Sequence, residues 1–350
     1  MSVTLTSNTA LNQQIDPSLV QQALALIEPA HRIAILAHEH PDGDCLGSAL
    51  GLAHILEQIG KTCVPACADA APPVFSFIPG IEQLQQTLGE PGNEPFDLVI
   101  AVDAGELSRY GTLYKRHQTF LEQVPILNID HHVSSGGCGR VNIIDPTAAA
   151  TGELLVLFQQ QARLPLSQAA AQCLLTGIIT DTSSFQFTST TSRTMEVGAE
   201  LLRAGAVAEP VVKAIYRSRP WPQVHFSAMV INQAHIACAG RLIWSYATNE
   251  TLKAVSATPG MDDNMSGTLR DVEGVQIAAF FKAYDDPHET RLSLRTAEPY
   301  HAANICIRYG GGGHARAAGA TINLPLEEAM TLVVADLQYE IEQQDQQQQQ

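Results

Sequence analysis

Residues 32–60 read RIAILAHEHPDGDCLGSALGLAHILEQIG, and this stretch decides the fold. It begins with an apolar, β-rich run, continues through a short polar loop, and ends in a longer helical pattern. Four more β-rich runs follow, TCVPAC (62–67), DLVIAVD (97–103), PILNID (125–130) and VNIID (141–145), and helical patterns cover 151–161, 166–180 and 192–204. Strands that alternate with helices predict an α/β domain with a mainly parallel sheet.

The pattern changes after a proline-containing segment, residues 206–222, where we predict a linker. Beyond it, several β-rich runs, the first three expected to pair as antiparallel strands, and two helical patterns predict a smaller α+β domain. The expected strands are 241–247, 275–284, 291–297 and 317–324, and the expected helices are 301–310 and 325–342. The predicted organisation is a loose N-terminus (1–15), an α/β domain (16–205), the linker (206–222), a second domain (223–340) and a Gln-rich tail (341–350).

The composition limits the classes of function. A chain of 350 residues with 45% hydrophobic and 16% charged residues is typical of a folded globular protein. Its formal net charge of −16 argues against a surface that coats long duplex nucleic acid. There is no basic leader and no apolar stretch of the about 18 residues that a membrane span needs, so we expect no membrane association. Seven cysteines, an odd number in mostly apolar surroundings, predict reduced thiols and a cytoplasmic location.

Acidic and imidazole side chains fall where the predicted strands end. They are His38, Asp42, Asp44, Asp103, Asp130, His131, His132 and Asp181. Because loops from several strands converge at the C-terminal edge of a parallel sheet, these side chains are expected to share one pocket. Clustered carboxylates cannot all stay ionised unless cations neutralise them. An oxygen-rich set with imidazole and without thiolate suits Mn²⁺ or Mg²⁺, and Mn²⁺ is preferred because Mg²⁺ seldom takes several histidines.

Single members of this set also have structural interpretations. Asp42 and Asp44, two residues apart on an extended loop, are expected to project in the same direction. Asp44 is also a candidate to cap a helix that begins at Cys45. An isolated aspartate at a strand end commonly forms a cap or a turn, so the metal hypothesis depends on the whole set.

Five motifs in order resemble the DHH family of phosphoesterases. They are HEHPDGD from His38, VDAGE around Asp103, the triplet Asp130, His131 and His132, GIITDTSSFQF around Asp181, and RYGGGGHARAAGA from Arg308. The resemblance covers roughly residues 17–340. It implies an N-terminal DHH domain and a smaller C-terminal DHH-associated domain, with a cleft between them and the linker as a hinge.

The resemblance also implies a role for each residue of the set. One metal ion would be held by His38, Asp42 and Asp103, and a second by Asp44, Asp103, His131 and Asp181. His132 would face the substrate phosphate as electrostatic or acid support, and Asp130 would orient the histidine pair. The implied cofactor is two Mn²⁺ ions, with Mg²⁺ or Co²⁺ as substitutes, which would activate a water for attack on phosphorus.

In the second domain, the glycine run predicts an anion-binding concavity, because backbone N–H groups there can approach a ligand closely. The expected substrate-binding residues are Arg295, Gly311, Gly312, Gly313, His314 and Arg316. The chain also departs from the family pattern: Ser183 and Gln186 stand where relatives often have glycine and arginine. Arg193 is a candidate replacement for that arginine.

The function implied is hydrolysis of short oligoribonucleotides to mononucleotides, together with removal of the 3′-phosphate of adenosine 3′,5′-bisphosphate. The expected partners are short RNA or mono- and dinucleotides, and similar proteins suggest a homodimer. The alternative within the same chemistry is a soluble phosphodiesterase for cyclic di-AMP or linear dinucleotides. A nucleotide-binding module without catalysis would require an eroded metal ligand, and all six implied ligands are present. Inorganic pyrophosphatase is disfavoured because that related group lacks the glycine run.

Overall fold

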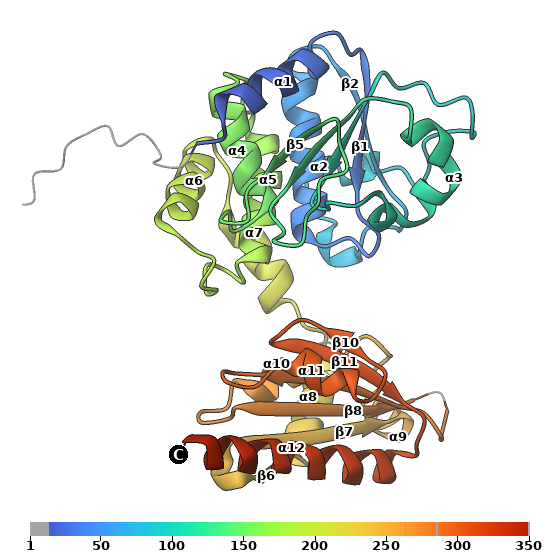
Figure 1. The fold of residues 1–350 in the computed structure, drawn as a ribbon, viewed down its shortest axis with the longest axis vertical. Helices are drawn as coiled ribbons and strands as arrows, with labels where there is room; N and C mark the ends of the chain where they lie inside the picture. Colours follow the sequence, from blue (N-terminus) through green and yellow to red (C-terminus); the bar gives the residue numbers. More distant parts are fainter. Residues whose placement is uncertain (1–13, 263, 285, 349–350) are drawn as a thin grey trace, which may run out of the picture. The chain divides into compact units, whose positions relative to one another are not determined.

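The computed structural model describes residues 14–262, 264–284 and 286–348, and the chain divides into two compact units, Met1–Ser218 and Arg219–Gln350 (Figure 1). The predicted loose N-terminus falls mostly on residues outside this description. Ile15, which is described, is buried, and its N–H donates a hydrogen bond to Gln161 Oε1 at 2.9 Å. The chain is therefore packed from this residue onward. No described helix is both long and apolar enough to traverse a bilayer.

The first unit is built on a five-stranded sheet. Its strands are β1 (Arg32–Ala37), β2 (Thr62–Cys67), β3 (Leu98–Val102), β4 (Ile126–Asp130) and β5 (Val141–Ile144). They lie in the order β2-β1-β3-β4-β5, and every pairing is parallel. The predicted α/β architecture is confirmed. Because β1, β3 and β4 are neighbours, their C-terminal ends form one continuous edge.

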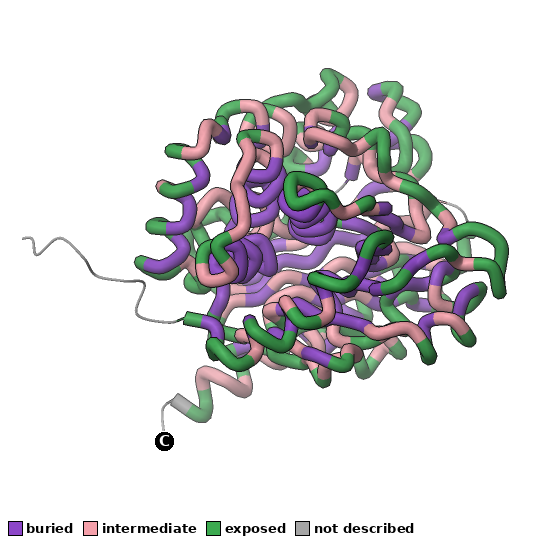
Figure 2. Tube along the Cα trace, turned by 90° about the horizontal axis from the view of Figure 1, so that it is seen from above, coloured by how far each residue is buried: buried purple, intermediate pink, exposed green. Residues whose placement is uncertain are grey.

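Helices cover both faces of this sheet, since successive side chains of a strand point to opposite sides. Ile33 and Ile35 of β1 belong to one buried cluster, whereas Ala34 and Leu36 belong to another. Buried residues accordingly fill the interior strands and the inner sides of the helices (Figure 2). The helices are α1 (Pro17–Ile27), α2 (Gly43–Glu57), α3 (Gly111–Leu121), α4 (Thr151–Gln161), α5 (Gln168–Asp181) and α6 (Ser192–Arg203), with short helical turns η1 (Pro73–Phe75), η2 (Ile81–Gln83) and η3 (Leu107–Tyr110).

Helices α2 and α5 approach each other closely at glycine positions. A Cβ at Gly47 would overlap the carbonyl oxygen of Cys173, and a Cβ at Gly51 would lie 2.8 Å from the Leu174 side chain. Glycine therefore lets the two backbones pack together at a distance that a side chain would prevent. This packing brings the N-terminus of α2 and the C-terminus of α5 to the same side of the unit.

The segment predicted as a linker is largely helical. It contains α7 (Ala208–Val212) and the π-helical turn η4 (Lys213–Arg217), and α8 (Trp221–Asn232) begins inside it. The prolines do not interrupt these helices, because Pro222 occupies the first turn of α8, where a missing N–H costs no helical hydrogen bond. The boundary between the two units falls between Ser218 and Arg219.

The second unit contains a six-stranded mixed sheet in the order β10-β11-β9-β8-β7-β6. The strands are β6 (His235–Ala237), β7 (Leu242–Thr248), β8 (Ile277–Ala283), β9 (Thr290–Thr296), β10 (Gly312–Gly313) and β11 (Ala317–Ile322). The α+β prediction is confirmed, but β7 and β8 pair in parallel, so the expectation of antiparallel pairing there was wrong. The reason is the connection between them, which contains α9 (Asn249–Ala254) and α10 (Met265–Arg270) and is long enough for a crossover.

The remaining helices of the second unit are η5 (Cys238–Gly240), α11 (Ala302–Ile307) and α12 (Leu326–Gln348). Helix α12 lies along one face of the sheet (Figure 1). It also continues into the segment predicted as a Gln-rich tail, where Ile341 is 1% exposed and Asp345 accepts two hydrogen bonds from Arg241, both at 2.6 Å. Part of the glutamine-rich segment is thus ordered by its apolar and acidic members.

Candidate active site

The strand order brings the predicted site residues to one edge of the first sheet. His38, Asp103 and Asp130 lie at or directly after the C-terminal ends of β1, β3 and β4. Asp181 is the last residue of helix α5, so it does not follow a strand as its grouping with the strand-end residues implied, whereas the helix predicted over 166–180 is confirmed. Asp181 reaches the same edge since α5 packs against α2.

The start of helix α2 separates the two aspartates of the HEHPDGD segment. Asp42 caps the helix, with its Oδ1 accepting hydrogen bonds from the N–H groups of Asp44 and Cys45, both at 3.0 Å. The expectation that Asp44 caps the helix was wrong. The two carboxylates also do not share a direction, because the Asp42 side chain is 56% exposed and the Asp44 side chain only 1%.

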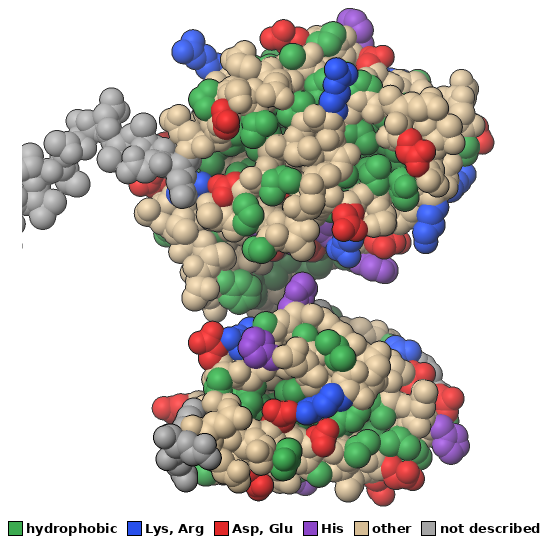
Figure 3. Space-filling view, viewed as in Figure 1, with side chains coloured by type: hydrophobic (Ala, Val, Ile, Leu, Met, Phe, Trp, Pro, Cys, Tyr) green, Lys and Arg blue, Asp and Glu red, His purple; other side chains and the backbone are tan. Residues whose placement is uncertain are grey.

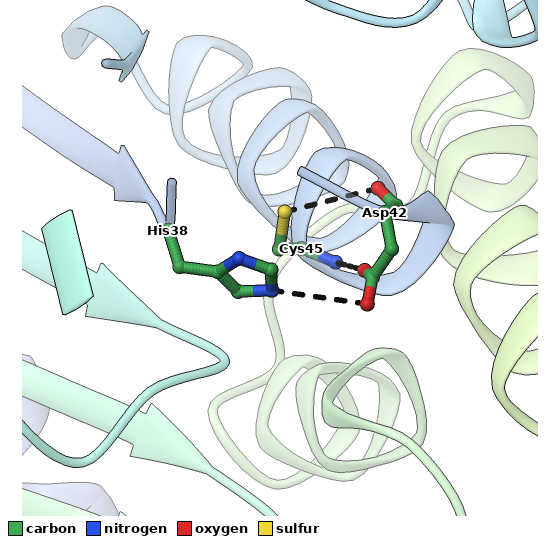
Figure 4. A group of neighbouring side chains, drawn as sticks. All are labelled: His38, Asp42 and Cys45. Atoms are coloured by element: carbon green, nitrogen blue, oxygen red, sulfur yellow. Dashed lines mark hydrogen bonds and ion pairs between the residues drawn. The ribbon is translucent and has the colours of Figure 1, made fainter. Parts of the chain in front are cut away.

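One half of the site, which we call the His38 half, contains His38, Asp42 and one oxygen of Asp103. His38 Nε2 lies 3.8 Å from Asp42 Oδ2 and 3.5 Å from Asp103 Oδ2. The other ring nitrogen, Nδ1, donates to the carbonyl oxygen of Glu39 at 2.8 Å, so Nε2 carries the free lone pair. Figure 4 shows His38 and Asp42 facing one another across the first turn of α2, with Cys45 beside them.

The opposite half, the His131 half, is built in the same way. His131 Nε2 lies 3.9 Å from Asp44 Oδ2, 3.6 Å from Asp103 Oδ1 and 3.4 Å from Asp181 Oδ2. Its Nδ1 donates to the carbonyl oxygen of Ala148 at 3.2 Å, which again leaves Nε2 as an acceptor. A Cβ at Gly177 of α5 would overlap Asp44 Oδ1, so glycine at this position makes room for the carboxylate.

Asp103 joins the two halves. Its Oδ2 faces His38 and its Oδ1 faces His131, and the residue is 2% exposed. Its φ of 60° lies in the left-handed region, which residues with a Cβ seldom adopt, although aspartate tolerates it better than most. The backbone thus holds this carboxylate between two imidazoles.

The electrostatics of the cluster favour binding of a cation. Burial and the neighbouring Asp44 raise the pKa of Asp103 well above its usual range, and burial also raises the pKa of Asp44. For Asp181, burial and Asp44 raise the pKa to about 7. Ligand atoms that share one ion at about 2.1 Å lie roughly 3–4 Å apart, which matches the distances in both halves. Free imidazole lone pairs and carboxylate oxygens at this spacing fit a divalent cation in each half.

The third residue of the triplet has a different environment. His132 Nδ1 donates to Asp130 Oδ1 at 2.7 Å, and the His132 side chain is 48% exposed whereas Asp130 is fully buried. This hydrogen bond raises the pKa of His132. Burial raises the pKa of Asp130, but hydrogen bonds from His132 and Ser135 and the charge of His132 together outweigh burial and hold that pKa below its usual value. Asp130 therefore fixes the orientation of His132 and favours its protonated form.

The sequence reasoning missed the N-terminus of α4. Asp44 accepts hydrogen bonds from the N–H groups of Thr151, at 2.6 Å, and Gly152, at 3.0 Å. The Thr151 hydroxyl donates to Asp103 Oδ1 at 2.8 Å. The sequence predicts a helix start at residue 151, and a helix N-terminus is a favourable place for carboxylates, so this signal was present in the sequence.

Arg193 does not replace the missing family arginine. Its guanidinium is buried and pairs with Glu153 Oε1 at 2.5 Å and Asp145 Oδ2 at 2.9 Å. Glu153 lies in the first turn of α4, so the ion pair supports the helix that holds Asp44 and Asp103. Ser183 stands where relatives often have glycine, and it adopts a left-handed φ of 49°.

A sulfur atom also lies beside the His38 half. The predicted ligand set contained no thiol, but Cys45 Sγ, a nitrogen of His38 and a carboxylate oxygen of Asp42 all lie within 4.8 Å of one another. Cys45 is fully buried, and burial raises the pKa of its thiol well above the usual range. All seven cysteines of the chain are free thiols.

In the second unit, basic side chains share one face of the sheet. Arg291, Ser293 and Arg295 alternate with buried leucines along β9 and line a cavity of about 410 Å³, together with Lys282 of β8. The predicted Arg295 lies in this cavity. The period-two pattern of RLSLR was a signal for Arg291 that the sequence reasoning did not use.

The same cavity contains an acidic group. Asp262 is buried, accepts a hydrogen bond from the Tyr284 hydroxyl at 2.9 Å, and lies 3.3 Å from Lys282 Nζ. On the face of the molecule drawn in Figure 3, lysine and arginine are interspersed with acidic side chains in each unit. The basic groups of the cavity are therefore a local cluster.

The predicted glycine run divides into positions with different constraints. A Cβ at Gly311 would overlap the carbonyl oxygen of Gly319, and a Cβ at Gly313 would lie 2.6 Å from Ala317 O, so close approach of β11 requires glycine at both. Gly312 has open space around it. Gly311 borders a second cavity, of about 350 Å³, which is also lined by Lys282.

His314 and Arg316, which follow the glycine run, have different environments. His314 is exposed. Arg316 donates to the carbonyl oxygen of Tyr300 and to Glu298 Oε1, both at 2.6 Å, so its guanidinium already has partners. The structure thus places Arg295 and Gly311 at the two cavities, whereas neither His314 nor Arg316 lines them.

Comparison with known families agrees with this architecture. The N-terminal domain of the DHH family matches residues 32–178, and the DHHA1 domain matches residues 247–343, together more than half of the chain. The chain belongs to the DHH family. The family resemblance predicted from the five sequence motifs is confirmed.

Among DHH-family relatives, the bifunctional oligoribonuclease and PAP phosphatase NrnA of Thermus thermophilus is 29% identical over 329 residues, which is 92% of this chain and 94% of that protein. The cyclic-di-AMP phosphodiesterase GdpP of Geobacillus thermodenitrificans is 27% identical over 85% of this chain, but the match covers only 46% of that protein. The crystal structure of an exopolyphosphatase-related protein from Bacteroides fragilis has a TM-score of 0.83 and 21% identity, covering 94% of this chain and 97% of that one. This likeness confirms the DHH fold.

Proposed function

We propose that this DHH-family chain hydrolyses phosphate esters in short oligoribonucleotides and removes the 3′-phosphate of adenosine 3′,5′-bisphosphate. The observation that supports the proposal is the position of Asp103, whose two carboxylate oxygens lie 3.5 Å from His38 Nε2 and 3.6 Å from His131 Nε2. One buried carboxylate between two imidazole acceptors suits a pair of divalent ions that share it. The Thermus relative is named for both of these activities.

The proposed cofactor is two Mn²⁺ ions, one held by the His38 half and one by the His131 half. When bound, the ions would supply Lewis-acid charge for the phosphoryl oxygens and an activated water. The protein contributes the geometry: Asp103 is held by the Thr151 hydroxyl, and Asp44 by two backbone N–H groups of α4. These hydrogen bonds orient the carboxylates before substrate arrives.

His132 is proposed to act on the substrate rather than on a metal. Its Nδ1 is engaged with Asp130, and its half-exposed ring can present Nε2–H to a phosphate oxygen or to the leaving group. The hydrogen bond to Asp130 raises the pKa of His132, which favours the form that donates this proton. The pair thus resembles other arrangements in which a buried carboxylate orients a catalytic imidazole.

The second unit is proposed to bind the rest of the nucleotide. Lys282, Arg291 and Arg295 converge on one face of its sheet, and guanidinium groups bind phosphate oxygens in bidentate fashion. The cluster is local and the net charge of the chain is −16, so few phosphates can be neutralised at once. This favours substrates of a few nucleotides over long single strands or duplexes.

The test is a hydrolysis assay with short oligoribonucleotides and adenosine 3′,5′-bisphosphate in the presence of Mn²⁺. The wild-type chain should release mononucleotides and phosphate, and chelation should abolish both activities. Asp103→Asn, which keeps the shape of the side chain, should lower kcat by about 10³-fold or more, since both halves lose a charged ligand. Undiminished turnover by this folded variant would refute the assignment of Asp103.

The similarity to GdpP supports a second candidate, hydrolysis of cyclic di-AMP or of linear dinucleotides. The same metal halves would serve this reaction, so only substrate binding can separate the two. The kcat/KM values for cyclic di-AMP, a linear dinucleotide and adenosine bisphosphate should be compared under one set of conditions. A cyclic substrate preferred by more than about tenfold, equivalent to about 1.4 kcal/mol, would favour this candidate.

A further inference from the structure

Cys45 places a thiol at the edge of the His38 half. It lies in the first turn of α2, three residues after the helix cap Asp42, and is fully buried. Its Sγ, a nitrogen of His38 and a carboxylate oxygen of Asp42 form a group in which no pair of ligand atoms is more than 4.8 Å apart. Figure 4 shows the sulfur beside both residues.

The surroundings of this sulfur suit a cation. His38 is buried, and its Nε2 faces a carboxylate oxygen of Asp103 at 3.5 Å and one of Asp42 at 3.8 Å. These atoms are all electron-rich, and they repel one another unless a positive charge lies among them. The sulfur itself makes only a weak contact, with the Asp42 carbonyl oxygen at 3.7 Å. Because this hydrogen bond is long, the Cys45 thiol loses little free energy when it turns towards an ion.

We propose that Cys45 acts as a sulfur ligand for an ion in the His38 half, and that this half therefore binds softer divalent ions such as Cd²⁺ or Zn²⁺ more tightly than the His131 half does. The inference rests on the proposed metal-dependent function. On binding, the thiol proton leaves to solvent and the sulfur lone pair forms the bond to the ion. The donors around that ion are then imidazole nitrogen, carboxylate oxygen and thiolate.

The group is compact enough for its side chains to close on one ion. Zinc binds sulfur at about 2.3 Å and imidazole nitrogen at about 2.1 Å, so in a tetrahedral site two such ligand atoms lie roughly 3.6 Å apart. The ligand atoms of Cys45, His38 and Asp42 lie within 4.8 Å of one another, so their side chains would draw together around the ion. Soft thiolate ligands select zinc-like ions, whereas sites made of carboxylate oxygens suit Mn²⁺. The His131 half contains no sulfur in its described ligand group of Asp44, His131 and Asp181.

A neighbouring cysteine provides a matched control. Cys67 is also fully buried, at the end of β2, and its Sγ donates to the carbonyl oxygen of His38 at 3.2 Å. Its sulfur therefore lies near the same histidine, but on the backbone side, and it is not part of the metal-ligand group. A variant at Cys67 changes a nearby buried thiol without removing the proposed ligand.

The experiment is titration of the metal-free full-length chain with Cd²⁺, followed by ultraviolet absorption and calorimetry. The wild type and Cys67→Ala should develop the sulfur-to-cadmium charge-transfer band. Cys45→Ala and Cys45→Ser should lack it and bind Cd²⁺ at least about tenfold more weakly, with little change in Mn²⁺ affinity. Circular dichroism of both Cys45 variants checks that they fold.

The outcomes separate the two proposals. If the wild type binds Mn²⁺ and Cd²⁺ by calorimetry but shows no sulfur band, or if Cys45→Ala keeps the band, the sulfur ligand is refuted and the metal-dependent function stands. If the wild type binds neither ion, both proposals fail. A band that is lost in the Cys45 variants and kept in Cys67→Ala supports the assignment.

Discussion

At the scale of single residues, Asp130 illustrates how a buried carboxylate controls the orientation of a neighbouring imidazole, that of His132, for which we propose a catalytic role. It is fully buried and accepts the Nδ1–H of His132 at 2.7 Å. We expect Asp130→Asn to lower kcat by about 10–100-fold with unchanged Mn²⁺ affinity, because an amide can orient the ring but cannot stabilise its protonated form. The measurement is kcat as a function of pH. Protonated His132 should lose its proton at a lower pH in the variant than in the wild type. An unchanged dependence of kcat on pH would contradict the proposed role of Asp130.

A second residue-scale prediction concerns stability. Glu94 Oε1 accepts a hydrogen bond from His117 Nδ1 at 2.5 Å, and both side chains are buried. Burial raises the pKa of Glu94, but the hydrogen bond from His117, backbone hydrogen bonds and the charge of His117 together outweigh it, so the pKa is lowered from its ordinary 4.5. A lowered folded-state pKa gives stability that is present above pH 4.5 and is lost as the pH falls through the folded value.

The corresponding measurement is urea unfolding of the wild type and Glu94→Gln between about pH 7 and pH 3. The glutamine side chain of this variant retains an acceptor for His117 but does not titrate. The advantage of the wild type over the variant should therefore shrink as the pH is lowered through this range. An advantage that grows with acidification would show that the sign is wrong.

At the scale of elements, the glycine run before and within β10 contains positions that need glycine for strand packing and positions that do not. A Cβ at Gly311 would overlap Gly319 O of β11, whereas a Cβ at Gly312 meets open space. We expect Gly311→Ala to destabilise the chain by about 1–3 kcal/mol, as overpacking does, and Gly312→Ala to leave stability nearly unchanged. Thermal unfolding of the two variants provides the comparison. Equal losses at both positions would contradict the strand packing described above.

At the scale of the whole molecule, the ligand set confines metal binding to one unit. All six proposed ligands lie between residues 38 and 181, within Met1–Ser218. Because an ion that binds only the folded state stabilises it by about 2.7 kcal/mol at a hundred times its Kd, Mn²⁺ should slow hydrogen exchange in β1, β3, β4 and the start of α4. Exchange in β7, β8 and β9 should stay unchanged by the metal alone. Protection that appears only in the second unit would overturn the assignment.

The sequence by itself determined the alternation of strands and helices in the first unit and the identity of the candidate ligands. Local periodicity is enough for elements such as α4, whose predicted bounds, 151–161, match Thr151–Gln161. Predicted strand ends are likewise enough to place His38, Asp103 and His131 at one edge of the sheet, because a strand end fixes where a following side chain emerges, whereas their roles as ligands are implied by the family resemblance.

The family resemblance implied a division of these residues into two sets, but only the tertiary structure decided the side-chain directions on which that division depends. The cap at Asp42 rotates its carboxylate towards His38, whereas packing of α2 against α5 and α4 turns Asp44 the other way. Parallel pairing of β7 with β8 and the approach of Cys45 to the His38 half depend on contacts between segments far apart in the chain or on side-chain directions. Such contacts are set by the packing of the whole core, and no local pattern encodes them.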